Sequence, residues 1–221
     1  MPTLRLFIAF DTPPTVRPAL AAMRDELKLS HAEVKWEPDA KFHCTIKFLG
    51  DTPEHLVPEL IARTENASAA TRPFSVRYRN VGCFPSLRDP RVVWIGIENP
   101  EGELLELSKQ LESALIPLGF QTERKAFHPH VTLGRVKGRK NLNELLTMLE
   151  TVTFESQPVT IPSIEIVKSE LKTGGSEYSI VRSILFSNCL RKKQFSRVYI
   201  VKGDSHGRGK RRKISGAEDR P

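Results

Sequence analysis

The chain has 221 residues, of which 39% are hydrophobic and 27% are charged, and its formal net charge is +8. This composition is typical of a globular protein with one large domain or two small lobes, and no apolar run is long enough to cross a membrane. The three cysteines have no CxxC spacing and are odd in number, which argues against a disulfide framework and fits a reducing cytoplasm.

The first half of the chain predicts alternating strands and helices. Short apolar or alternating runs predict strands; these are residues 3–10, a run that ends at Gly50, 74–84 and 91–97. Apolar residues three or four positions apart predict helices; these are residues 14–29 and a helix that begins at Asp51-Thr52-Pro53.

The second half repeats this order. The helices expected there are residues 101–118 and 141–149, with Asn141 as a candidate N-cap. The expected strands are residues 129–136, 159–171 and 178–186, the last two joined by a turn at 173–176. Repeated helix–strand units of this kind predict an α+β fold with two similar lobes related by a pseudo-twofold axis.

The positive charge is concentrated at the C-terminal end. Residues 188–221 contain 11 Lys or Arg and 3 Asp or Glu, so residues 1–187 are formally neutral. The basic clusters and weak apolar pattern predict a disordered tail. Two alternatives stay open: a tail that binds RNA by displacing counterions at phosphates, and a docked strand at 197–201. Because residues 1–187 carry no net charge, an anionic substrate must be attracted to them by local charged groups.

The same short pattern occurs twice, as His43-Cys44-Thr45-Ile46 and as His130-Val131-Thr132-Leu133. Successive side chains of a strand point to opposite faces, so the His and Thr of each motif share one face and its other two residues share the other. If the two strands lie side by side, two imidazoles and two hydroxyls meet in one cleft. Cys44 then points into the core, which argues against a nucleophilic role.

These four side chains suit acid–base chemistry on a phosphate. Histidine, with an ordinary pKa of about 6.5, can give or take a proton near neutrality. Hydrolysis of a cyclic phosphodiester needs a base for the attacking water and an acid for the departing ribose oxygen, which two histidines can supply. Threonine hydroxyls can donate hydrogen bonds to the non-bridging oxygens. We therefore expect neither a metal nor a cofactor.

A metal site is the alternative that the triplet His128-Pro129-His130 raises. Both histidines could reach one zinc ion, with His43 as the third ligand. However, no acidic or cysteine ligand adjoins either motif, and the proline distorts the strand. We favour His128 as a strand-entry residue that supports His130. The other histidines lie in polar stretches and are expected at the surface: His31, His55 and His206.

Two cations near the motifs are candidate phosphate ligands. Lys47 falls on the motif face by strict alternation. Arg135 falls on the opposite face unless Gly134 permits a β-bulge.

Four aromatic residues are weighed as base platforms or as packing residues. Phe48 or Phe84 could stack on a base, as aromatic side chains do on single-stranded ends. Trp36 and Trp94 are expected to pack in the core or at its rim.

The chain resembles the 2H phosphoesterase superfamily, and within it the RNA 2′,3′-cyclic phosphodiesterase branch, formerly called 2′-5′ RNA ligase. Besides the paired motifs, the resemblance is carried by RLFIAFD, FHCTIKFLGD, VGCFPSLRDPRVVWIGI, FHPHVTLGRV and KSELKTGGSEYSIV. It implies a domain over residues 1–187, bilobal and α+β, with two antiparallel sheets around a central cleft. It also implies metal-independent opening of a terminal 2′,3′-cyclic phosphate on RNA to leave a 2′-phosphate. The tail, 188–221, has no counterpart in the pattern.

By motif position, the resemblance makes His43 the proton donor to the leaving 3′ oxygen and His130 the proton acceptor that activates water. Thr45 and Thr132 would hold the phosphate. Apart from the resemblance, we also expect Arg135 among the substrate-binding residues, which requires the bulge at Gly134. We expect a cytoplasmic monomer whose partner is RNA with a cyclic phosphate end. Two alternatives remain: the reverse joining of such ends through a 2′,5′ linkage, and a non-catalytic RNA-binding protein, against which the intact histidines argue.

Overall fold

The computed structural model describes residues 2–123, 125–173 and 175–187. The strands within these residues are β1 (Thr3–Asp11), β2 (Val34–Trp36), β3 (His43–Pro53), β4 (Phe74–Phe84), β5 (Val92–Glu98), β6 (His130–Val136), β7 (Val159–Ile161), β8 (Ser163–Lys172) and β9 (Gly175–Leu185). The α-helices are α1 (Arg17–Lys28), α2 (Val57–Ser68), α3 (Glu103–Leu115) and α4 (Leu142–Thr151). Short 3₁₀ turns occupy Asp39–Lys41, Glu54–Leu56 and Ile116–Leu118.

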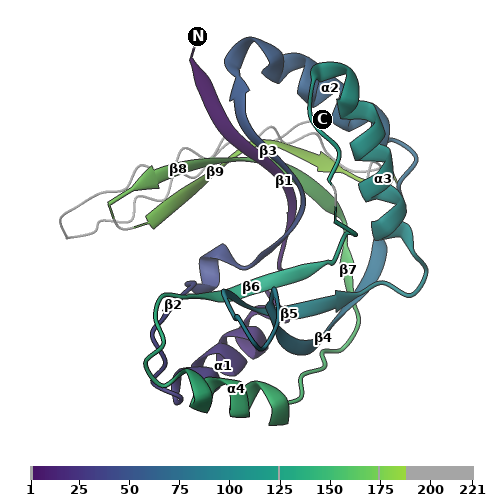
Figure 1. The fold of residues 1–221 in the computed structure, drawn as a ribbon. Coiled ribbons are helices and arrows are strands. Elements are labelled where there is room, and N and C mark those ends of the chain that lie inside the picture. The colour runs from purple at the N-terminus through teal and green to yellow at the C-terminus, as the bar shows by residue number, and fades with distance from the viewer. Residues whose placement is uncertain (1, 124, 174, 188–221) are drawn as a thin grey trace, which may run out of the picture. The chain divides into compact units, whose positions relative to one another are not determined.

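The strands form one curled antiparallel sheet in the order β7-β4-β5-β6-β3-β1-β8-β9, with β2 paired to β6 (Figure 1). We call β2 and β4–β7 the His130 half, and β1, β3, β8 and β9 the His43 half. Among the described residues, β3 and β6 share a single residue pair, Cys44 with Val131. The predicted α+β class and its antiparallel strands are confirmed, and the two expected sheets are halves of one continuous sheet.

The His130 half and the His43 half of the sheet each contain strands from both the first and the second half of the sequence. Strand β5, from the first half of the sequence, pairs with β6 from the second, and β8 returns from the second half to pair with β1. Helix α1 contacts β6 and α4, whereas α3 contacts β3 and packs against α2. Figure 1 shows these two helix pairs at opposite ends of the curled sheet. The sequence repeat therefore does not divide the fold into two consecutive lobes.

The helices cover one face of the sheet, and the core lies between them. Strand positions that alternate with the cleft face supply one side of the core, among them Leu6, Ile8, Phe10, Cys44, Val93, Ile95, Val131 and Leu133. The helices supply the other side with stripes that include Leu20, Leu27, Leu60, Leu104, Leu107, Leu111 and Leu145. Burial of each such side chain contributes about 1.5–3 kcal/mol. The opposite face of the sheet is left for the motif side chains.

Two predicted boundaries are wrong, for reasons of strand pairing. Residues Asp51–Pro53 continue β3, because they pair with Thr3–Arg5 of β1, and the next helix begins at Val57. The predicted strand 159–171 is interrupted at Pro162: β7 pairs with β4 and β8 pairs with β1.

Asn141 precedes α4 at the N-cap position, but its side chain does not cap the helix. Its backbone is left-handed, with φ of 50°. The side-chain amide instead donates to the His31 carbonyl at 3.2 Å. The predicted cap position is therefore correct and the predicted cap interaction is wrong.

The expectations for the tail, including the strand at 197–201 and the surface position of His206, lie outside the described residues, as does Cys189, the third cysteine. Cys44 and Cys83 are both buried and unpaired. None of the helices in the described part of the chain has the length and hydropathy to span a bilayer.

Candidate active site

The adjoining strands β3 and β6 bring both motifs to one cleft. His43, Thr45, His130 and Thr132 all line it, and its volume is about 390 Å³. Cys44 lies on the opposite face, fully buried, and burial raises the pKa of its thiol to about 12. The thiol is therefore protonated at neutral pH and points away from the cleft, as the alternation of the motif predicts.

A β-bulge lies at the last residue of each motif. Ile46 has no partner in the β1–β3 register, and Leu133 has none in the β5–β6 register. A bulge shifts the alternation of a strand by one residue. It therefore brings Phe48 and Arg135, which hold equivalent positions after the two motifs, back to the cleft face.

The bulge at Ile46 overturns the prediction for Lys47. The Lys47 side chain is buried on the core face, where its Nζ contacts a Glu112 carboxylate oxygen at 2.5 Å and the Gln121 carbonyl at 3.0 Å. The lysine therefore stabilises the packing of α3 and the following loop on β3, and its charge does not face the cleft.

Gly134 is what lets the second bulge pack against β2. A Cβ at this position would lie 2.7 Å from Val34 Cγ1 and 2.8 Å from Trp36 Cε3. We expect Gly134→Ala to destabilise the protein by about 1–3 kcal/mol, the usual cost of overpacking. Urea unfolding monitored by circular dichroism measures this cost, and an unchanged midpoint would show that β2 gives way freely.

The two histidines are held in the same way. His43 Nδ1 lies 2.7 Å from the Lys41 carbonyl, and His130 Nδ1 lies 2.7 Å from the His128 carbonyl. A carbonyl can only accept a hydrogen bond, so in both rings Nδ1 carries the hydrogen and donates it. Nε2 of each neutral ring is then the atom that can take a proton. The arrangement leaves the same nitrogen of both rings for chemistry in the cleft.

Burial lowers the pKa of both imidazoles below the ordinary value of histidine, because it penalises the charged ring. Their charged neighbours differ. The Asp11 carboxylate favours protonated His43, Arg135 disfavours the protonated form of both rings, and His128 also disfavours protonated His130. Asp11 is therefore a neighbour that distinguishes the two rings, because it favours the proton on His43.

Aromatic rings surround each histidine. Phe7 and Tyr178 pack on His43, with ring centroids 5.1 and 5.4 Å away. Phe84 packs edge-on against His130 at 5.0 Å. These rings supply the apolar surroundings that desolvate the imidazoles and restrict their rotation.

Of the aromatic candidates, Phe48 and Phe84 both line the cleft. Phe48 is 64% exposed and contacts Phe7 on the cleft side. Phe84, in contrast, already packs against the ring of His130. Trp94 is half-buried and packs on Phe84 with centroids 5.0 Å apart. Trp36 is half-buried against Gly134, so both tryptophans pack as expected.

His128 supports His130 through its main chain, and its own imidazole packs against Phe84 and Trp94. Within the described residues, no three His, Cys, Asp or Glu side chains are grouped closely enough to hold a metal ion. His31 and His55 are exposed, as expected.

Sequence reasoning missed several cleft residues that lie outside the motifs. Among them are Arg5, Phe7, Glu37, Lys41, Ser169, Ser176 and Tyr178. For two of them a signal existed, because alternation along β1 places Arg5 and Phe7 on one face with Asp11, which pairs with His43. Glu37 and Lys41 lie in the segment just before His43, where no pattern marked them. Ser169, Ser176 and Tyr178 come from segments far away in the sequence, and only the sheet order brings them to the cleft.

Comparisons with known proteins agree with this geometry. The sequence matches the family described as LigT like phosphoesterase over residues 10–94 and again over 95–178. It is 35% identical over 166 residues to a protein of Aeropyrum pernix named RNA 2′,3′-cyclic phosphodiesterase, covering 75% of this chain and 93% of the relative. A protein of the same name from Aquifex aeolicus is 33% identical over 184 residues, covering 82% and 96%.

Solved structures show the same fold. The structure of TT0787 of Thermus thermophilus has a TM-score of 0.71 at 26% identity and covers 83% of this chain and 98% of its own. Escherichia coli LigT complexed with 3′-AMP has a TM-score of 0.67 at 22% identity, with coverage of 84% and 99%. From the match over both repeats, the chain belongs to the LigT-like phosphoesterase family.

Proposed function

We propose that the protein hydrolyses the terminal 2′,3′-cyclic phosphate of RNA to a 2′-phosphomonoester. The observation that carries this proposal is the pair of imidazoles, each held through Nδ1 by a carbonyl and each lining one cleft with a threonine from its own motif. The names of the relatives from Aeropyrum pernix and Aquifex aeolicus support the substrate class.

In this mechanism, His130 Nε2 takes a proton from a water molecule as the water oxygen attacks phosphorus. The bond from phosphorus to the 3′ oxygen breaks, and His43 Nε2, protonated at the start, gives its proton to that oxygen. The hydroxyls of Thr45 and Thr132 and the Arg135 guanidinium bind the non-bridging oxygens, where negative charge increases as water attacks. The product leaves with His43 neutral and His130 protonated, so a proton exchange with solvent restores the enzyme.

The direct test is to incubate the purified protein, in excess chelator, with a short RNA that ends in a 2′,3′-cyclic phosphate. We expect a 2′-phosphate terminus, identified by mass spectrometry and by its resistance to a 3′-phosphatase. A well-folded sample that yields a 2′,5′-linked dimer would instead support ligation, and one that binds RNA without turnover would support a binding protein.

The pH dependence follows from the two lowered pKa values. The base must be neutral and the acid protonated, and in the free enzyme both imidazoles titrate below the ordinary value of about 6.5. We expect kcat/KM to rise as the base loses its proton and to fall again as the acid loses its own, with an optimum below about pH 6.5. Bound phosphate favours the imidazolium, so the kcat profile should lie at higher pH. A kcat/KM optimum above pH 8 would contradict this assignment.

We also propose the wider setting of the activity. Residues 1–187 form the phosphoesterase domain, which includes both family matches, and the basic segment 188–221 is an appendage to it. The unpaired, buried Cys44 and Cys83 fit a reducing cytoplasm. Both histidines come from one chain, which is consistent with activity as a monomer.

A further inference from the structure

A short segment connects β2, which pairs with the motif strand β6, to the other motif strand, β3, and it lies at the edge of the cleft. This connecting segment, Glu37–Phe42, leaves β2, which pairs with β6, and enters β3 at His43. Its first residue donates from its backbone N–H to the Leu133 carbonyl of β6 at 2.8 Å. Since β3 and β6 share one residue pair among the described residues, the conformation of this segment helps to set how the two motifs face each other.

Two groups of the connecting segment act on residues of the cleft. The Lys41 carbonyl, at the end of the 3₁₀ turn, accepts the hydrogen bond from His43 Nδ1. The Glu37 carboxylate, 17% exposed, lies 3.8 Å from Arg135 Nε. One end of the segment therefore orients the proposed acid, and the other orients a proposed phosphate ligand.

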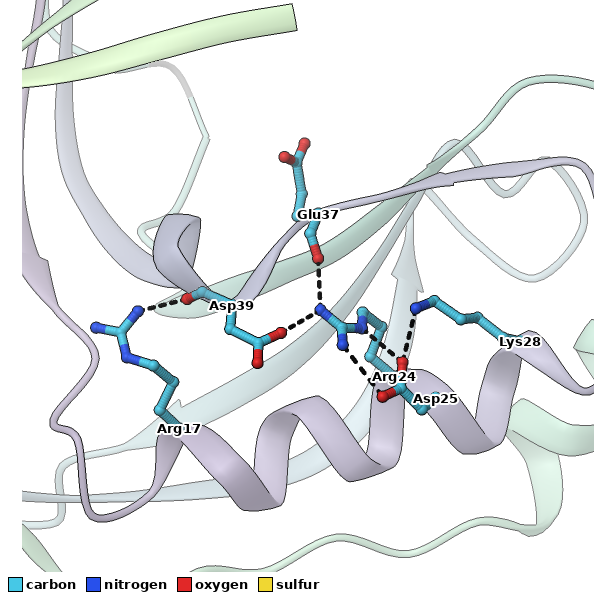
Figure 2. A network of polar contacts seen from close by, with 6 residues as sticks. All are labelled: Arg17, Arg24, Asp25, Lys28, Glu37 and Asp39. Atoms are coloured by element: carbon cyan, nitrogen blue, oxygen red, sulfur yellow. Dashed lines mark hydrogen bonds and ion pairs between the residues drawn. The ribbon is translucent and has the colours of Figure 1, made fainter. Parts of the chain in front are cut away.

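A buried arginine of α1 binds this connecting segment through hydrogen bonds and an ion pair. Arg24 is 7% exposed, and its Nη1 donates to the Glu37 carbonyl at 2.9 Å and to the Asp39 carboxylate. Its guanidinium also lies over the ring of Phe42, 5.6 Å from the centroid, and pairs with Asp25 on its own helix. Figure 2 shows the Glu37 carbonyl facing Arg24 while the Glu37 side chain points away from it. A buried guanidinium that loses a partner is costly, so Arg24 restricts movement of the segment.

A second arginine of α1 ties the same segment to the strand beside His43. Arg17 donates to the Asp39 carbonyl through one nitrogen and to the Asp11 carboxylate, at 2.7 and 2.8 Å, through the other (Figure 2 shows the contact with Asp39). Asp11 is the residue of β1 that pairs with His43. Helix α1 thus holds both the connecting segment and the neighbour that favours the protonated form of His43.

We propose that Arg24 and Glu37 are positioning residues of the active site. Arg24 fixes the connecting segment so that the Lys41 carbonyl aligns His43, and Glu37, fixed by the same contact, aligns Arg135 through its carboxylate. This inference rests on the proposed function for its kinetic consequences. Misplacement of a reacting group by about 1 Å costs on the order of 10²-fold in rate, so loss of this support should be visible in kcat.

The kinetic test compares Arg24→Met, Arg24→Lys and Asp39→Asn with wild type on the cyclic phosphate RNA, per mole of folded protein. We expect kcat to fall by about 10–100-fold in Arg24→Met. Arg24→Lys should recover part of it, and Asp39→Asn, which keeps the arginine, should show a smaller loss in the same direction. Arg63→Met, which removes a partly exposed ion pair with Glu59 on α2, is the control and should leave kcat unchanged.

Glu37→Gln keeps the backbone contacts and removes the carboxylate. We expect it to raise KM with a smaller effect on kcat, and to be non-additive with Arg135→Met, because both changes break the same pair. Fully additive effects of these two substitutions would overturn the role of Glu37.

A spectroscopic measurement tests the role of Arg24 without substrate. In ¹⁵N NMR spectra of the imidazoles, wild type should show the Nδ1–H tautomer for both motif histidines. Arg24→Met should reduce that tautomer at His43 and leave His130 unchanged. Unchanged His43 signals, kcat and pH profile in folded Arg24→Met and Asp39→Asn would overturn the inference. Wild-type protein that shows the tautomer but no turnover would instead overturn the proposed function alone.

Discussion

Replacing His130 with alanine should lower kcat for cyclic phosphate hydrolysis by about 10²–10⁴-fold, the usual contribution of a general base. His43→Ala should produce a loss of similar size, because the 3′ oxygen is a poor leaving group without a proton. Both imidazoles line the cleft and make one side-chain hydrogen bond each, so the fold should survive either change. Single-turnover kinetics, with circular dichroism as the folding check, measure the effect.

Two further comparisons sharpen this prediction. His55→Ala, at an exposed position on the turn before α2, is the matched control and should retain wild-type kcat. A cyclic or diester substrate with a nitrophenol leaving group needs no acid, so His43→Ala should retain most of its activity on it while His130→Ala does not. If His130→Ala, and not His43→Ala, retained activity on this substrate, the two roles would be exchanged. The double variant should lower kcat for the RNA substrate little more than the worse single variant does.

Replacing Lys47 with alanine should destabilise the fold by about 3 kcal/mol, at the lower end of the cost of breaking a buried ion pair. The lysine side chain is 1% exposed, and its loss leaves Glu112 without its cation and the Gln121 carbonyl without its donor. We place the cost at the lower end because Glu112 is 19% exposed and also accepts from the Glu123 backbone N–H. Urea denaturation gives the free energy of unfolding.

The double substitution Lys47→Met with Glu112→Leu tests whether the loss of stability comes from leaving Glu112 without its cation. An apolar pair of similar volume removes both charges, so it should recover most of the stability lost in Lys47→Ala. Lys109→Ala, an exposed lysine on α3, should change stability by less than about 0.5 kcal/mol. If Lys47→Met kept full stability but raised KM for RNA, the lysine would act on the substrate after all.

Local sequence patterns predicted much of the site. The spacing His-x-Thr-x, with an apolar residue after each polar one, predicts a half-buried strand that shows His and Thr on one face, and in the structure both motif strands do so. It also predicts a buried Cys44. These features depend on a strand's period of two residues, which the sequence displays directly.

Strand pairing decided what the sequence pattern left open. Strict alternation placed Lys47 in the cleft and Arg135 outside it, and the paired bulges at Ile46 and Leu133 reversed both positions. At Arg135 the neighbouring Gly134 had left a bulge open as a possibility, and the structure has it. No local pattern indicated the bulge at Ile46, because a bulge exists only relative to a partner strand. The same holds for Asp51–Pro53. Their sequence is typical of a helix start, but in the structure they pair with β1 and extend strand β3.

The sequence by itself determined the chemistry: two histidines, two threonines and the faces that carry them. The tertiary structure alone decided how that chemistry is supported. The sheet order brought Tyr178 to His43 and Phe84 to His130, and α1 brought Arg24 to the connecting segment. Contacts between residues so far apart in the chain arise when whole helices and strands pack together. Many core residues contribute to the free energy of that packing, so no short sequence motif predicts it.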